Sequence, residues 1–221
     1  MRHLIALALL AAPIALAVAD PTPADVVADF TTRGGRTKSD DKRPGSPVWT
    51  IDLHRVAVTD TDLVHLAKFP DVEVLDLSYT KVTDDGLKHL VGLKKLRLLA
   101  LYGTAVTDDG MKHLSGLKTL TTVFLAETAV GDAGLKHLAG LTEMDGLELD
   151  HTKVTDAGLA HLKRMTKLRR LELGHTAVTN AGLRELTELK NLRTLDLFRT
   201  KVTSEGAKAL QTALPETRLT Y

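Results

Sequence analysis

The chain has 221 residues, of which 43% are hydrophobic but only 4% aromatic, and its formal net charge is +1. Because the charge is nearly balanced, the sequence lacks the basic excess that drives binding to phosphate backbones, and no nucleic-acid partner is expected. The sequence has no cysteine, which excludes disulfides, thiol catalysis and cysteine-based metal sites.

Residues 1–19 differ in composition from the rest of the chain. Arg2 precedes an apolar, alanine-rich stretch that ends in the small-x-small triplet 17–19. This pattern is typical of a secretory signal peptide. The alternative is a membrane anchor, but a spanning helix needs roughly 20 apolar residues, and Pro13 interrupts this shorter stretch. We therefore expect export to the periplasm or the extracellular space, with no membrane span after cleavage.

Residues 20–47 are predicted to be an N-terminal cap followed by a linker. A short helix is expected over residues 23–30, where Val26, Val27 and Phe30 can cover the end of the domain that follows. The alternative is a disordered linker, because the middle of this segment is polar and contains glycine and proline.

Residues 48–215 consist of seven units of 24 residues. A leucine anchors each unit, a valine recurs five residues later and another leucine thirteen residues later. The anchors are Leu53, Leu77, Leu101, Leu125, Leu149, Leu173 and Leu197. A period of this length, kept over seven copies, indicates a solenoid of stacked repeats.

Within one unit the apolar period changes from that of a strand to that of a helix. Residues 75–77 alternate apolar and polar, which is strand spacing, whereas Leu87 and Leu90 lie three apart, as on one face of a helix. Thr83 is a good N-cap for that helix. One unit cannot bury its apolar residues alone, so each must stack on its neighbours.

Each unit resembles a leucine-rich repeat of the pattern L-x-x-L-x-L-x-x-T-x-V-T-D-x-G-L-x-x-L. This motif is similar to that of exported bacterial leucine-rich proteins. It also resembles the cysteine-containing repeats of F-box-type substrate adaptors, with threonine in place of cysteine. The resemblance implies an α/β fold, a right-handed horseshoe with a parallel sheet on the concave face and short helices on the convex face. Val56 replaces the threonine in the first unit, and the sequence contains no F-box segment.

The repeated threonine occupies the place where this family has a buried asparagine or cysteine. We expect its hydroxyl to satisfy backbone groups of the turn that stacking removes from water. The column consists of Thr80, Thr104, Thr128, Thr152, Thr176 and Thr200. After the last helix, residues 216–221 are predicted to form a short capping strand.

Histidine also recurs with the repeat period, as His65, His89, His113, His137 and His161. A ladder of metal sites is one interpretation. The other is a copied, solvent-facing helix surface, which is favoured because a tetrahedral zinc site cannot easily be assembled from one residue per repeat. We expect no metal and no cofactor.

The positions on the predicted concave face vary between repeats while the core positions do not, as a binding surface requires. Three aromatic residues and several carboxylates are expected to gather there. The candidate partner-binding residues are Asp76, Tyr79, Tyr102, Phe124, Glu148, Asp150, His151 and Glu172.

Adjacent carboxylates on neighbouring strands destabilise a sheet. Compensation could come from Arg170 and Arg199 of the same chain or from basic groups of a partner. Calcium is a further alternative because all the donors are oxygen atoms, although their spacing is loose.

Asp52, His54 and Ser78 face the same way and superficially supply an acid, a base and a nucleophile. The sequence has no nucleophile elbow and no glycine-rich oxyanion loop. We therefore predict a non-enzymatic module that binds a protein or peptide. A partner with basic groups would complement the carboxylates. The alternatives are a self-associating structural component of the bacterial envelope and a substrate adaptor of a larger complex.

Overall fold

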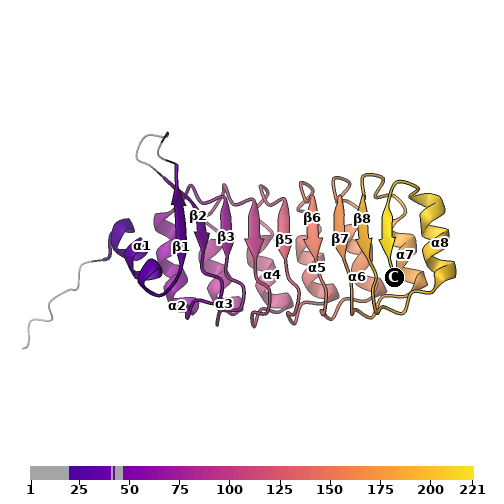
Figure 1. Cartoon of the computed structure of the whole chain (residues 1–221), viewed down its shortest axis with the longest axis horizontal. Coiled ribbons are helices and arrows are strands. Elements are labelled where there is room, and N and C mark those ends of the chain that lie inside the picture. Colours follow the sequence, from indigo (N-terminus) through magenta and orange to yellow (C-terminus); the bar gives the residue numbers. More distant parts are fainter. Residues whose placement is uncertain (1–19, 41, 43–46) are drawn as a thin grey trace, which may run out of the picture.

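The computed structural model describes residues 20–40, 42 and 47–221, so the predicted signal peptide lies outside the described residues. The described chain forms two layers, one nine-stranded sheet and a row of short helices (Figure 1). The strands are β1 (Arg36–Ser39), β2 (Val48–Asp52), β3 (Val74–Asp76), β4 (Leu98–Ala100), β5 (Thr122–Phe124), β6 (Gly146–Glu148), β7 (Arg170–Glu172), β8 (Thr194–Asp196) and β9 (Arg218–Thr220). The predicted α/β architecture is confirmed.

One helical segment follows each strand from β2 to β8, and one helix precedes β1. In four of the repeats this segment is split into one α-turn and a 3-10 turn, whereas α4 and α5 are continuous. The helices are α1 (Pro23–Thr32), α2 (Asp60–Leu63), η1 (Val64–Lys68), α3 (Asp84–Leu87), η2 (Lys88–Leu90), α4 (Asp108–Leu114), α5 (Asp132–Leu138), α6 (Asp156–Leu159), η3 (Ala160–Leu162), α7 (Asn180–Leu183), η4 (Arg184–Leu186) and α8 (Ser204–Ala213). No helix of the described residues is long and apolar enough to cross a membrane.

The strands lie in sequence order, and all pairs from β2 to β9 are parallel. Register is fixed by the repeat, because each strand residue pairs with the residue 24 positions further on, as Leu75 does with Leu99. Positions that are equivalent in sequence are therefore neighbours in space, at the strand spacing of about 4.8 Å.

The repeated leucines and valines form one continuous core between the sheet and the helices. Leu125, Val123 and Val130 of the central repeat are fully buried, and the cluster extends from Val26 to Leu214. Such a core grows by equal steps along the solenoid, so no single repeat holds it together.

The threonine column satisfies the backbone as predicted. Thr128 is buried, and its hydroxyl donates to the carbonyl oxygen of Leu125 at 2.6 Å. The same bond recurs in the other repeats that carry this threonine, with the hydroxyl 2.6 to 2.7 Å from the carbonyl of the anchor leucine. An unsatisfied carbonyl at this depth would cost about 1–3 kcal/mol.

A second ladder links each repeat to the next on the side of the helix N-termini. The carboxylate of Asp132 accepts from the backbone N–H and the hydroxyl of Thr155, at 2.8 and 2.6 Å. The glycine that follows in the motif makes room for this carboxylate, because a Cβ on Gly158 would lie 2.3 Å from Asp132 Oδ1. This close approach explains the T-D-x-G motif. The motif is shared by repeats whose surface residues differ.

The N-terminal segment covers one end of the core. Helix α1 begins with a capping box between Thr22 and Asp25 and buries Val26 and Phe30. The strand that follows it, β1, pairs antiparallel with β2 and is a feature that the sequence did not predict. At the other end, residues 218–220 form the last parallel strand, β9.

The histidine column is less exposed than expected. His137 is exposed, but His65, His89, His113 and His161 are half-buried. Within the described residues none of them belongs to a group that could hold a metal ion.

Candidate partner-binding site on the open face of the sheet

The face of the sheet turned away from the helices, called the open face here, carries most of the candidate residues. Asp76, Phe124, Glu148 and Glu172 occupy the last residue of their strands and pair across the sheet in one column with Ala100. Tyr102 and Asp150 lie in the next column on the same face, two residues further along the chain. Tyr79 and His151 lie one residue beyond that column, on the rim where the strands end.

This rim has a backbone conformation that the sequence did not predict. The residue two positions after each anchor leucine is left-handed, with φ between 54° and 62°: Arg55, Tyr79, Gly103, Glu127, His151, His175 and Arg199. For a residue other than glycine this conformation costs roughly 1–2 kcal/mol. Gly103 was the one sign of it in the sequence, since glycine favours such positions. The turn geometry of the repeat therefore holds six side chains along the rim.

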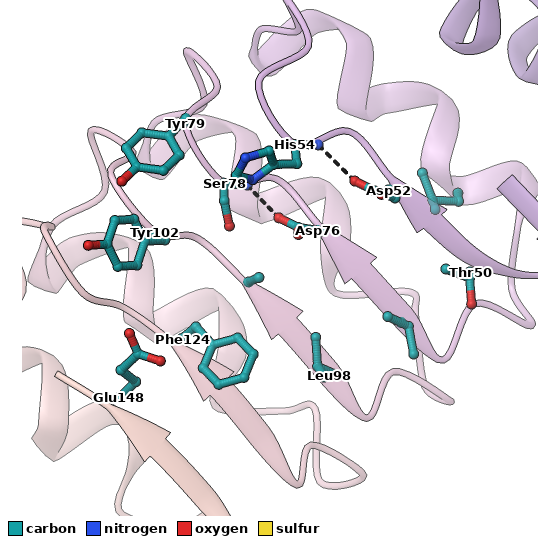
Figure 2. Close-up of a pocket in the computed structure, with 13 residues that line it drawn as sticks. Thr50, Asp52, His54, Asp76, Ser78, Tyr79, Leu98, Tyr102, Phe124 and Glu148 are labelled. Atoms are coloured by element: carbon teal, nitrogen blue, oxygen red, sulfur yellow. Dashed lines mark hydrogen bonds between the residues drawn. The ribbon is translucent and has the colours of Figure 1, made fainter. Parts of the chain in front are cut away.

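A pocket of about 540 Å³ lies on the open face and is lined by residues from β2 to β6 (Figure 2). Its floor is hollow because the small Ala100 pairs with Asp76 on one side and Phe124 on the other. We call it the aromatic pocket; it is lined by Thr50, Ile51, Asp52, His54, Val74, Asp76, Ser78, Tyr79, Leu98, Ala100, Tyr102, Phe124 and Glu148.

One wall of the aromatic pocket is a pair of tyrosines. The rings of Tyr79 and Tyr102 lie side by side, with centroids 5.0 Å apart (Figure 2). Gly103 permits this contact, because a Cβ there would lie 2.7 Å from the Tyr79 ring. His54 meets Tyr79 edge-on at 5.6 Å, and the guanidinium of Arg55 lies 5.0 Å from the same ring. Tyr79 is nevertheless 40% exposed, so its ring remains available to a partner.

Tyr102 is fixed by its hydroxyl as well as by its ring. The hydroxyl donates to Glu127 at 3.0 Å. Burial, together with hydrogen bonding to Tyr79 and Glu127, raises the pKa of Tyr102 far above its ordinary value. The phenol is therefore a neutral group, held in place before any partner arrives.

Beside the aromatic pocket lie four carboxylates, Glu148, Asp150, Glu172 and Asp196, which we call the acidic cluster. Oxygen atoms of Asp150, Glu172 and Asp196 lie within 4.8 Å of one another. Gly174 makes room for Asp150, since a Cβ on that glycine would lie 2.5 Å from its Oδ1. The aromatic pocket and the acidic cluster meet at Glu148, which lines the pocket and pairs with Glu172 in the sheet.

The acidic cluster is electrostatically strained. Burial, and then the negative charges of Glu172 and Asp150, raise the pKa of Glu148 to about 7. Burial and the charge of Glu172 likewise raise the pKa of Asp150 to about 6. The pKa values of both carboxyl groups are therefore raised mainly because burial removes the charged form from water, and further because each ionisation adds negative charge next to other carboxylates.

Neither arginine considered for local compensation forms an ion pair with the cluster among the described residues. The guanidinium of Arg199 lies over the ring of Phe198, 5.3 Å from its centroid. The charge of Arg170 lowers the pKa of Glu148, but less than burial and the neighbouring carboxylates raise it.

A second aromatic row follows the rim above the acidic cluster. The rings of His151 and His175 stack at 3.8 Å, and Phe198 meets His175 edge-on at 5.8 Å. Burial and the charge of His151 lower the pKa of His175. His151 could be predicted from the sequence as a candidate residue, but its ring contacts could not, because contacts between repeats depend on the left-handed rim.

The acid, base and nucleophile considered above are not arranged as a catalytic group. Asp52 accepts from the backbone N–H of His54 at 3.0 Å, and Asp76 accepts from that of Ser78 at 2.8 Å (Figure 2). These are turn bonds, and no side-chain hydrogen bond joins Asp52, His54 and Ser78 in the described part of the chain. Ser78 is also buried.

Neutralising Glu148 is expected to stabilise the protein above neutral pH. Since the pKa of Glu148 is raised to about 7 in the folded state, its ionisation opposes folding. This destabilisation is complete above about pH 7 and vanishes below the ordinary value of 4.5. Glu148→Gln should therefore have a higher Tm than the wild-type protein at pH 8, and the difference should shrink towards pH 5. Thermal melts across this range measure it.

The Tm of the variant has to be compared with that of the wild-type protein at each pH, because protonation of His175 changes the stability in the opposite direction to protonation of Glu148. The pKa of His175 is lowered in the folded protein, so acid protonates this side chain more readily in the unfolded chain. His175 therefore lowers the stability of the protein as the pH falls. That contribution is common to both proteins and cancels in the difference. An equal Tm for both proteins at pH 8 would show that Glu148 is not strained.

Residues 54–218 match the profile of the family described as leucine-rich repeat region. The chain belongs to the leucine-rich repeat family. No curated protein matches this leucine-rich repeat protein in sequence.

Two solved internalin structures of Listeria monocytogenes resemble the fold. Internalin C2 has 21% sequence identity and a TM-score of 0.58, with 78% of this leucine-rich repeat chain and 81% of that chain covered. A second internalin, inlF, has 15% identity and a TM-score of 0.47, with 77% and 60% covered. At 21% identity, the likeness to internalin C2 concerns the fold alone.

Proposed function

We propose that this protein is a non-enzymatic binding module that takes a protein or peptide on the open face of its sheet. The observation that carries the proposal is the aromatic pocket, in which the exposed Tyr79 and the partly exposed Tyr102 and Phe124 lie next to the acidic cluster. Exposed aromatic patches on otherwise polar surfaces mark interaction sites, and solenoids use their sheet face in this way. Membership of the leucine-rich repeat family supports a partner-binding role.

We further propose that the protein acts outside the cytoplasm, after removal of residues 1–19. The support is the apolar stretch of that segment and its small-x-small ending. The mature chain is expected to begin at Asp20. Mass spectrometry of the natively expressed protein should show this loss, whereas a cytoplasmic protein that keeps Met1 would contradict export.

Site-specific photo-crosslinking tests the binding face. A crosslinking amino acid at Tyr79 places the probe at the aromatic pocket, and one at Val91 gives a matched control behind the sheet, after η2. The two side chains are similarly exposed, at 40% and 43%. The proposal expects crosslinks to another protein from position 79 and few from position 91. Crosslinks from position 91 between copies of this chain, with none from position 79, would instead support the self-associating envelope component.

A further inference from the structure

The two parts of the open face differ in what they can bind. The aromatic pocket is walled by Val74, Leu98, Tyr102 and Phe124, so it favours one large apolar side chain. The acidic cluster next to it presents four carboxylates without an ion pair in the described chain, so it favours a cation. Because Glu148 belongs to both, an occupant of one part lies against the other.

We propose that the open face binds an extended peptide segment whose large apolar side chain fills the aromatic pocket while a lysine or arginine two to four residues away lies on the acidic cluster. The inference rests on the proposed function and specifies the chemistry of the partner. A cation from the partner supplies the charge that Arg199 does not, since that guanidinium lies over Phe198.

The spacing follows from the sheet. Phe124 and Glu148 are paired residues on adjacent strands, so the nearest apolar and acidic groups are separated by one strand spacing, about 4.8 Å. From β4, under the centre of the pocket, to β7, within the cluster, there are three spacings, or about 14 Å. An extended chain advances about 3.3 Å per residue. In a segment that runs across the strands, the basic residue therefore lies two to four positions along the chain from the apolar residue.

The burial and mutual repulsion of the carboxylates in the free protein also indicate a cationic occupant. Glu148 and Asp150 both have pKa values raised towards neutrality by burial and by the other carboxylates. An ammonium or guanidinium placed among them would form charge-assisted hydrogen bonds and remove this repulsion. The basic side chains that border the cluster or interact with its neighbours are Arg170, His151, His175, Arg199 and Arg218.

A peptide selection tests the proposal. Random heptapeptides displayed on phage are selected on the full-length protein and, in parallel, on Glu148→Gln/Glu172→Gln, in buffer containing EDTA so that no metal bridges the carboxylates. Peptides from the wild-type protein should be enriched in lysine or arginine two to four residues from a large apolar residue. Peptides from the variant should keep the apolar preference and lose the basic one.

A synthetic peptide from the wild-type selection then completes a double-mutant cycle. Changing its basic residue to glutamine should weaken binding to the wild-type protein by roughly tenfold or more, about 1.4 kcal/mol, and binding to the variant hardly at all. Thermal melts confirm that the variant is folded.

Two outcomes would overturn the inference in different ways. Selected peptides that depend on Tyr102 and Phe124 but show no basic preference would refute the cationic partner and leave the binding function intact. Absence of any enrichment on the wild-type protein would refute peptide recognition. The crosslinking at Tyr79 would then decide separately whether the open face binds a folded protein.

Discussion

Replacing both Tyr102 and Phe124 by alanine is expected to weaken partner binding by at least about thirtyfold while hardly changing the Tm. An aromatic anchor of this kind commonly carries about 2 kcal/mol or more of binding energy. Loss of even one anchor would account for about thirtyfold, since about 1.4 kcal/mol corresponds to a tenfold change in affinity. Neither ring belongs to the buried leucine core, so the fold should tolerate their loss.

The measurement is a titration of the crosslinked partner against each variant, with thermal melts alongside. Val91→Ala is the control, because this exposed side chain lies on the helix side of the protein and does not line the aromatic pocket. If the double variant keeps full affinity, the binding site is elsewhere on the molecule.

The second large effect concerns the core. Leu125→Ala, in the central repeat, should lower the free energy of unfolding by about 2–5 kcal/mol, because the side chain is fully buried and its removal leaves a cavity. His113→Ala, half-buried on the helix side, should cost no more than about 0.5 kcal/mol. Denaturant midpoints of the two variants give the comparison, since a change in midpoint at constant slope reports stability. A costlier histidine change would mean that the inside and outside columns of the repeat are assigned wrongly.

The core and the sheet register could be predicted from the sequence because they depend on repetition. A leucine that recurs every 24 residues must occupy equivalent places in stacked units, so the neighbours of Leu125 in space could be named beforehand. The role of Thr128 could also be predicted, since a threonine that recurs beside buried leucines needs a backbone partner.

Strand β1 could not be predicted for the opposite reason. Residues 36–39 carry no apolar alternation and occur once, so their pairing with β2 depends on backbone hydrogen bonds at the end of the stack. Sequence patterns report side-chain burial, and this strand buries almost nothing.

The side-chain positions in the candidate site depend on two neighbouring glycines, which leave room for them. Tyr79 can lie against Tyr102 because position 103 is glycine, and Asp150 has space because position 174 is glycine. The sequence placed these residues in adjacent columns but did not show which side chains would touch, because ring and carboxylate positions depend on the left-handed rim.

The ladder between repeats bears on how this protein can change during evolution. Its hydrogen bonds join residues 23 positions apart at every step, such as Asp132 and Thr155, so each unit carries an acceptor for the next unit and donors for the previous one. A tandem duplication or loss of one whole unit would rejoin equivalent partners at the new junction. A duplication of β5 and its helix would, however, move the aromatic pocket away from the acidic cluster by one strand spacing, about 4.8 Å. Gain or loss of whole units can thus change the distance between the partner groups that the surface recognises. The hydrophobic core needs no new kind of packing for this change.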